Sequence, residues 1–432
     1  MVPVLFGRGL ASLPDEILAE IMEWSGSDPL DLRLVSRRFY RIVMSLPRLW
    51  TSIPYDAPLN RLQLTLKHSV EKSLDVHLVF SDNPLETIRR MEMITPHAHR
   101  ITHLEVDCFT GQTDLMNTLL HAMNPSRLQI LAITHIVRSQ EEDGSIAQCT
   151  FYDGWYSPKL EILKSNDDIP KPIRGMSLRE CTIELTYSSA IWNLSLLSTF
   201  FAASPALERL TLYLKDFGST TGDFEPVTFH RLEFLEVTVS VDEDYLLSDL
   251  AWDEIIDGLM KNAPNLGELR LTTFIEDSDE LDGWFQATFG APHRFPSLHT
   301  LDISIRRAVD PPQYFIRRLF TSTPALRYLT LETLGLKLLP NNLDNFQGFL
   351  ALESISFRRC FGCNDRFFDD LLRALAKKWK SETDSEARDR KRATVSFIGC
   401  SNLHRDGIEN YWSRFFDVVW NDVNTDWHKH SV

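Results

Sequence analysis

Hydrophobic positions recur in one short pattern along most of the chain. From about residue 100 the pattern is apolar-x-x-apolar-x-apolar, often with a proline two residues before it. Because the last two apolar residues alternate with polar ones, each copy predicts a short strand with one buried face. The copies begin at Ile101, Leu128, Ile173, Leu207, Leu232, Leu266, Leu298, Leu326 and Leu352, the third being Ile173/Met176/Leu178, and Val395/Phe397 is a degenerate last copy.

Apolar residues at helical spacing precede several of these strands. The four clearest stripes lie within residues 115–120, 196–201, 255–260 and 315–320. A proline follows each stripe within a few residues, and proline ends a helix and favours an extended residue before it. The repeating unit is therefore a helix, a turn and a short strand. The long interval between the second and third copies contains Leu160-Glu161-Ile162-Leu163, which is either a broken repeat or an insertion.

The first fifty residues lack this unit and predict three short helices instead. Leu13-Pro14-Asp15-Glu16 is typical of a helix start, with Ser12 as the cap and Pro14 at the first helical position. Gly26 is placed to end this helix. For the other two helices, Asp28-Pro29 gives a start, Ser36 a cap and Pro47 an end.

Three motifs in this segment resemble the F-box. They are Leu13-Pro14-x-Glu16-Ile17-Leu18-x-x-Ile21, Leu34-Val35-Ser36-Arg37-Arg38-Phe39 and Leu46-Pro47-x-Leu49-Trp50, within residues 11–53. The resemblance implies binding to a Skp-family adaptor, which joins the cullin scaffold of an SCF-type ubiquitin ligase. It assigns adaptor contacts to Leu13, Pro14, Ile17, Leu18, Ile21, Val35, Phe39 and Trp50. So short a unit buries only a small core, so we expect about half of these side chains to pack the helices and the others to stay exposed.

The helix–turn–strand unit resembles a leucine-rich repeat of the long, irregular kind found behind F-boxes, over about residues 99–405. The combination is similar to fungal F-box proteins with divergent repeats. The resemblance implies an α/β fold in which a three-helix F-box precedes an open solenoid, with its strands lining a concave side. A closed barrel of βα units is the alternative, and the short strands and uneven spacing favour the open arc.

The remaining segments connect or end these two parts. Residues 1–10 form an N-terminal tail, and residues 54–98 a linker with a helix at 61–70 and a capping strand at 74–80. Residues 406–432 form a C-terminal cap or tail, in which the aromatic residues of 411–427 are suited to cover the last repeat. Acidic stretches at 141–143, 242–244 and 276–282 predict solvated loops between units.

Charge and cysteine content limit the partners. Of the 432 residues, 45 are Lys or Arg and 60 are Asp or Glu, which gives a net charge of −15. An acidic chain repels phosphate backbones and anionic membrane surfaces, so we expect neither nucleic acid nor membrane as partner. Six cysteines make no dense disulfide framework. We therefore expect an intracellular protein of the cytoplasm or nucleus.

Two groups of residues could hold a metal ion. Cys360, Cys363, Cys400 and His404 would make a zinc set, but Cys181, Cys360 and Cys400 each lie eight residues after the start of a repeat. In a leucine-rich repeat that position is a turn residue bonded to backbone. His97, His99 and His103 alternate, yet a polar surface run explains them better. We expect no metal, no cofactor and no catalytic residues, since no phosphate-binding loop, nucleophile elbow or zincin motif occurs.

If the strands line a concave face, the residues between the leucines point outward and are candidates for binding a target protein. They are Arg209, Tyr213, Phe234, Glu236, Glu268, Arg270, Tyr328 and Arg358. Exposed aromatic and arginine side chains are typical of binding hot spots. The sequence thus favours a non-catalytic substrate-recognition adaptor of a ubiquitin ligase. The alternatives are a scaffold or regulator without ubiquitin transfer and, less favoured, an enzyme on a βα barrel.

Overall fold

The computed structural model describes residues 13–80, 83–136, 148–186, 192–215, 220–240, 252–260, 262–274, 278–306, 315–333, 352–360, 368, 372–373, 375–376, 392–400, 403 and 405–421. The chain divides into two compact units. Unit 1 comprises residues 1–142 and 146–177, and unit 2 comprises residues 143–145 and 178–432.

Unit 1 begins with the three predicted helices, α1 (Asp15–Ser25), α2 (Pro29–Val35) and α3 (Arg37–Ser45). Gly26 ends α1 in the left-handed conformation, at a φ of 61°. The side chains of Asp28 and Ser36 cap α2 and α3 by accepting backbone N–H groups, as predicted. Pro14 is the N-cap of α1 and not its first helical residue, so the helix begins one residue later than expected. The predicted Ser12 cap lies outside the described residues.

A small core holds these helices together. It contains Leu18, Met22, Ile42, Val43 and Trp50, all buried. Trp50 lies in the 3-10 helix η2 (Pro47–Trp50), and its Nε1 donates a hydrogen bond of 2.9 Å to the Val43 carbonyl. The indole therefore fills the core and also binds the end of α3.

The rest of unit 1 alternates helices with parallel strands. In chain order the elements are β1 (Ser52–Ile53), α4 (Leu59–His68), β2 (Leu74–Phe80), α5 (Pro84–Ile94), η3 (Thr95–Arg100), β3 (Ile101–Phe109), η4 (Thr110–Gln112), α6 (Thr113–His121), β4 (Ile130–Ile136) and β5 (Ile162–Asn166). The strands pair in the order β1-β2-β3-β4-β5. A helix and a strand occur where they were predicted, as α4 and β2, but β2 pairs with both β1 and β3 and is therefore not an end strand, and α5 was not predicted.

Unit 2 continues the alternation. Its strands are β6 (Glu180–Leu185), β8 (Arg209–Lys215), β10 (Phe234–Ser240), β11 (Glu268–Phe274), β12 (Thr300–Ile305), β13 (Tyr328–Thr333), β14 (Ser354–Arg358), β15 (Thr394–Ile398) and β16 (Asp417–Asn421), paired in that order. Its helices are α7 (Leu194–Ala202), α8 (Trp252–Met260), α9 (Ser278–Phe289), α10 (Phe315–Ser322) and α12 (Arg405–Trp412). Strands β7 (Trp192–Asn193) and β9 (Thr220–Thr221) form a separate pair.

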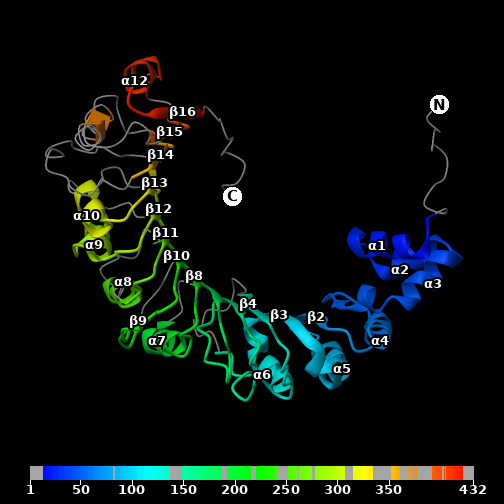
Figure 1. Ribbon diagram of the computed structural model, residues 1–432. Helices are drawn as coiled ribbons and strands as arrows, with labels where there is room; N and C mark the ends of the chain where they lie inside the picture. The colour runs from blue at the N-terminus through cyan, green and yellow to red at the C-terminus, as the bar shows by residue number, and fades with distance from the viewer. Residues whose placement is uncertain are drawn as a thin grey trace, which may run out of the picture. The chain divides into compact units, whose positions relative to one another are not determined.

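Leucines occupy equivalent positions on neighbouring strands of unit 2. Leu210, Leu235, Leu269, Leu301 and Leu329 are register partners from β8 to β13, and all are buried. Helices α7, α8, α9 and α10 follow one another along one side of this sheet (Figure 1). Each strand therefore buries alternate residues and leaves the residues between them on the opposite face.

Two local predictions were wrong, namely the repeat copy at Ile173 and the loop at residues 276–282. The copy Ile173/Met176/Leu178 does not enter a strand, because β6 begins at Glu180, and Cys181 rather than Met176 is the register partner of Leu210. The true copy starts at Leu178, which is buried. The fragment at 160–163 leads into a full strand, β5. Within the acidic stretch 276–282, residues 278–282 belong to α9, while the other two acidic stretches lie outside the described residues.

The four predicted helical stripes are confirmed as parts of α6, α7, α8 and α10. The strand order within each unit is linear. In the described parts of the chain, no helix has the length and apolar character needed to span a bilayer.

The alternation can be tested in one strand. Replacing Leu271, which is 1 % exposed, should destabilise unit 2 by about 2–5 kcal/mol, because Leu271→Ala leaves a cavity under the helices. Thr272→Ala on the opposite face of β11 should change stability by less than about 0.5 kcal/mol. Urea unfolding followed by tryptophan fluorescence would compare the two, and equal losses would contradict the assignment of faces.

Candidate functional site

The F-box-like helices present apolar side chains to solvent. Among the predicted adaptor contacts, Ile17, Ile21 and Val35 are 43 %, 40 % and 63 % exposed. Leu18 and Trp50 are both 1 % exposed and belong to the core. Leu13 and Phe39 are partly buried against that core, and Pro14 is exposed. The predicted set is thus divided between surface and interior.

Three exposed apolar residues in these helices were not predicted as contacts. Trp24 is 90 % exposed, Leu34 is 77 % exposed, and Tyr40 is also exposed. Leu34 stands inside the quoted motif Leu34-Val35-Ser36, so its position gave a signal that could have been used. Trp24 stands near the end of α1, outside the stripe that identifies the buried face.

Arg38 links α3 to the start of α1. Its side chain pairs with the Asp15 carboxylate at 2.5 Å and also donates to the Leu13 carbonyl. The beginning of α1, where Leu13 and Pro14 lie, is thereby held against α3 by a charge-assisted contact. The exposed apolar side chains are therefore displayed on a fixed arrangement of helices.

The second candidate surface is the polar face of the unit 2 sheet, and all eight predicted target-binding residues lie on its strands. Three register rows run across it. Arg209, Phe234, Glu268 and Tyr328 share the first row, Glu236 and Arg270 lie in the second, and Tyr213 and Arg358 in the third. Because residues of equal register point to the same face, the structure brings these side chains onto one surface.

At one end of the first row, two guanidinium groups cover an aromatic ring. The Cζ atom of Arg209 lies 3.9 Å from the Phe234 ring centroid and that of Arg270 lies 5.2 Å from it. Arg270 also pairs with Glu268 at 2.7 Å. Phe234 is only 4 % exposed as a result, so Arg209 and Arg270 present the charged surface there.

The next strands add a second group of charges. Arg358 lies 3.7 Å from the Asp302 carboxylate. Burial raises the pKa of Asp302, and the charges of Arg358 and Arg270 oppose that rise. Burial, together with Glu236 and Glu184, raises the pKa of Tyr213. The face is therefore densely charged, with arginine and acidic side chains intermixed.

Tyr328 lies at the exposed end of its strand, away from these pairs. Its hydroxyl donates a hydrogen bond of 2.9 Å to the Glu353 carboxylate. That hydrogen bond raises the pKa of Tyr328, because the carboxylate stabilises the neutral phenol and repels the phenolate. Tyr328 therefore exposes its aromatic ring to solvent while its hydroxyl proton is engaged in the hydrogen bond to Glu353.

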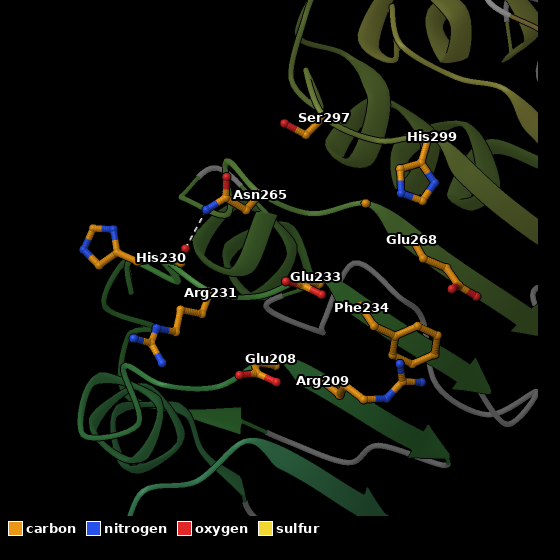
Figure 2. Close-up of a pocket in the computed structure, with 11 residues that line it drawn as sticks. Glu208, Arg209, His230, Arg231, Glu233, Phe234, Asn265, Glu268, Ser297 and His299 are labelled. Carbon is orange, nitrogen blue, oxygen red and sulfur yellow. Dashed lines mark hydrogen bonds between the residues drawn. The ribbon is translucent and has the colours of Figure 1, made fainter.

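A pocket of about 710 Å³ opens at the amino ends of β8, β10, β11 and β12 (Figure 2). It is lined by Glu208, Arg209, His230, Arg231, Glu233, Phe234, Asn265, Gly267, Glu268, Ser297 and His299. The amide of Asn265 donates to the His230 carbonyl at 2.6 Å and joins two of the loops that enter the strands. Arg209, Phe234 and Glu268 belong to both the pocket and the first row, so the two features are continuous.

The cysteines of the predicted repeat turns have two different roles. Cys360 and Cys400 are buried, and their thiols donate to the carbonyls of Leu331 and Phe357 at 3.7 and 3.5 Å. Both thiols therefore bond to backbone, as expected, but the acceptors lie in the strands β13 and β14 and not in the turns. Cys181 was assigned wrongly, because it is a core residue within β6. Cys363 and His404 lie outside the described residues.

The three alternating histidines do not share a strand face. His97 and His99 lie in η3, and His103 lies in β3. Nδ1 of His97 is 3.2 Å from the guanidinium of Arg100. Burial and the neighbouring charge of Arg100 lower the pKa of His97. Among the described residues, these three histidines do not form a group with converging ligand atoms.

Comparison with known proteins identifies one segment. Residues 10–53 match the family described as F-box-like. F-box domains generally bind Skp-family adaptors and are typically found in non-catalytic subunits of ubiquitin ligases, so the match supports a role as an F-box adaptor in an SCF-type complex. No curated protein matches the chain.

The Arg358–Asp302 pair predicts a pH-dependent stability. Asp302 has a raised pKa in the folded chain, so its contribution to stability is present at low pH and is lost as the carboxyl ionises. Arg358 reduces this loss. Arg358→Ala should therefore cost up to about 1 kcal/mol at pH 7 and less below about pH 3.9, where the carboxyl is protonated in both states.

Urea unfolding at the two pH values would measure the effect. In the Asp302→Asn background the difference between the two pH values should disappear. Arg405→Ala, which removes an exposed helix pair with Glu409, serves as the matched control. An unchanged pH dependence in the double variant would contradict the coupling.

Proposed function

We propose that the chain is a substrate-recognition subunit of an SCF-type ubiquitin ligase, acting in the cytoplasm or nucleus. The observation that supports this proposal best is the F-box-like segment at residues 10–53, whose helices display apolar side chains to solvent. In the proposal this segment docks on a Skp-family adaptor and through it on a cullin scaffold. The rest of the chain holds a target protein.

Packing considerations support docking through the exposed apolar side chains. The core of the three helices is small, and Ile17, Ile21 and Val35 stay outside it. Exposed apolar groups on so small a unit gain stability when a partner removes them from water. Leu18 and Trp50 then act indirectly, since they hold the helices in the arrangement that displays the contacts.

The polar face of unit 2 is the proposed target-binding surface. A leucine-rich-repeat solenoid is the architecture we propose for the helix–strand units, because their apolar positions recur at equal register from β8 to β13. The strand face carries aromatic and arginine side chains of the kind enriched in protein interfaces. Its acidic side chains give a mixed surface that suits a target with complementary charges of both signs.

No catalytic group is required of this chain. A ligase subunit of this kind accelerates transfer by holding a lysine of the target near the charged ubiquitin carrier, which is a proximity effect. Two separable surfaces are then sufficient, one for the adaptor and one for the target.

Docking can be tested without disturbing the core. The double variant Ile17→Glu/Val35→Glu should weaken binding to a purified Skp-family adaptor at least about tenfold, because it places two charges in the proposed apolar interface. The matched control is Leu85→Glu in α5, which places a charge on another exposed apolar residue (69 % exposed) and should bind as the wild type does. Calorimetry would measure the affinities, and equal affinity of all three proteins would exclude this docking surface.

Target capture can be tested on the polar face of unit 2. Phe234→Ala/Arg270→Ala/Tyr328→Ala should abolish recovery of ubiquitin-modified target proteins while leaving adaptor binding intact. The measurement compares proteins that accumulate on the chain with and without proteasome inhibition. Arg405→Ala controls for loss of a surface arginine elsewhere in unit 2. A non-degradative scaffold would show no protein that accumulates, and unchanged capture by the triple variant would exclude the proposed face.

A further inference from the structure

Three different metal-ligating side chains converge in the interior of unit 1. His135 lies on β4, Cys149 lies ahead of the turn at residues 151–154, and Asp168 follows β5. One ligand atom from each lies within 4.8 Å of the other two. All three residues are buried. Segments that are separate in sequence therefore meet at one point through imidazole, thiol and carboxyl groups.

The local backbone holds these groups in place. Nε2 of His135 lies 2.9 Å from Sγ of Cys149. Asp167 adopts the left-handed conformation, with φ of 54°, and so reverses the chain directly after β5. The hydroxyl of Ser165 donates to the Asp168 carbonyl at 2.8 Å and closes this turn. The carboxyl of Asp168 is thereby directed inward from a constrained loop.

The carboxyl of Asp168 lies inside the protein with no cationic side chain bonded to it among the described residues. It accepts hydrogen bonds from the Cys149 N–H and the Tyr152 hydroxyl, both long at 3.4 Å, and also from the Cys149 thiol. Lys171, the cation nearest in sequence, pairs with Asp153 at 3.5 Å and acts on Asp168 only through its charge. A buried carboxylate is costly unless a counter-charge accompanies it.

The imidazole of His135 is also incompletely satisfied. It is 3 % exposed, and its Nδ1 has no hydrogen-bond partner among the described residues. A buried ring nitrogen without a partner costs about 1–3 kcal/mol.

We propose that His135, Cys149 and Asp168 bind a zinc ion that has a structural role. Imidazole nitrogen, thiolate sulfur and carboxylate oxygen are all zinc ligands in proteins. The ion supplies the counter-charge for Asp168 and the Cys149 thiolate, and the thiol proton leaves to solvent on binding. Because two of the three ligands are a thiolate sulfur and an imidazole nitrogen, the site favours zinc over magnesium or calcium, which prefer oxygen ligands.

The fourth position of a tetrahedral zinc ion remains for water. Cys108, the register partner of His135 on the adjacent strand β3, is buried on the same face, but its thiol is not among the converging ligand atoms. Because the whole set is buried, the ion has no route to a macromolecular substrate. Its expected effect is to cross-link β4 and the two segments that flank β5.

Metal content of the full chain tests the proposal. Protein expressed with added zinc, with any affinity tag removed, should contain about one zinc ion per chain by mass spectrometry. The separate variants Cys149→Ser and Asp168→Asn should lose most of it. Cys181→Ser, another buried cysteine of the sheet, is the matched control and should retain the wild-type content. Wild-type protein without bound zinc would overturn the proposal, as would equal zinc content in all variants.

A second measurement does not depend on how well the variants fold. Replacement of zinc by cobalt in the wild-type chain should give a thiolate-to-cobalt charge-transfer absorption, and a chelator should remove it and lower the melting temperature of the protein. The absence of that absorption, or a melting temperature unaffected by the chelator, would show that His135, Cys149 and Asp168 are a hydrogen-bonded core cluster only.

Discussion

The structure depends on one constraint, which is that a parallel ladder places equivalent residues of successive strands side by side. Leu271 therefore lies between Val237 and Ile303, its register partners on the neighbouring strands. Helices cover the face formed by these residues, and no single helix–strand unit could bury it alone. The same register orders the opposite face, so Arg209, Phe234 and Glu268 meet there although they are far apart in sequence. Core and candidate interface are two results of one pairing pattern.

The F-box-like helices follow a different principle. They have few residues to bury, and Trp50 fills much of their interior while bonding the Val43 carbonyl. With that residue in the core, Ile17 and Val35 are left on the surface. The exposed apolar groups thus follow from how little interior three short helices can provide.

Much of this architecture could be predicted from the sequence because its signals are local. Ser36 caps a helix through its own side chain, and Gly26 ends one by its own backbone freedom. The copy at Ile173 failed because two overlapping apolar patterns fit there, and only pairing with β8 selects the one that starts at Leu178. Helix α9 was not predicted because its first residues are acidic and were assigned to a loop. Its later residues Trp284 and Phe285 are buried.

The candidate sites were predictable to different degrees for the same reason. Strand alternation was enough to place Arg209 and Arg270 on the polar face, but not to show that both guanidinium groups cover Phe234. The cluster of His135, Cys149 and Asp168 has no sequence motif at all, since its members come from three segments and meet only through the fold. Exposure of single side chains, as for Trp24, likewise depends on which neighbours pack beside them.

The end of the F-box-like segment is itself part of the sheet. Ser52 and Ile53 form β1 and pair with Asp75 and Val76 of β2, and Arg61 in α4 is ion-paired with Asp28 at 2.7 Å. A fragment cut after residue 53 would leave β1 without its partner strand β2, so the backbone groups of Ser52 and Ile53 would be unpaired. It would also remove His68, whose ring lies 5.2 Å from that of Trp50. The F-box-like segment is therefore better regarded as the first layer of unit 1 than as a separable tag.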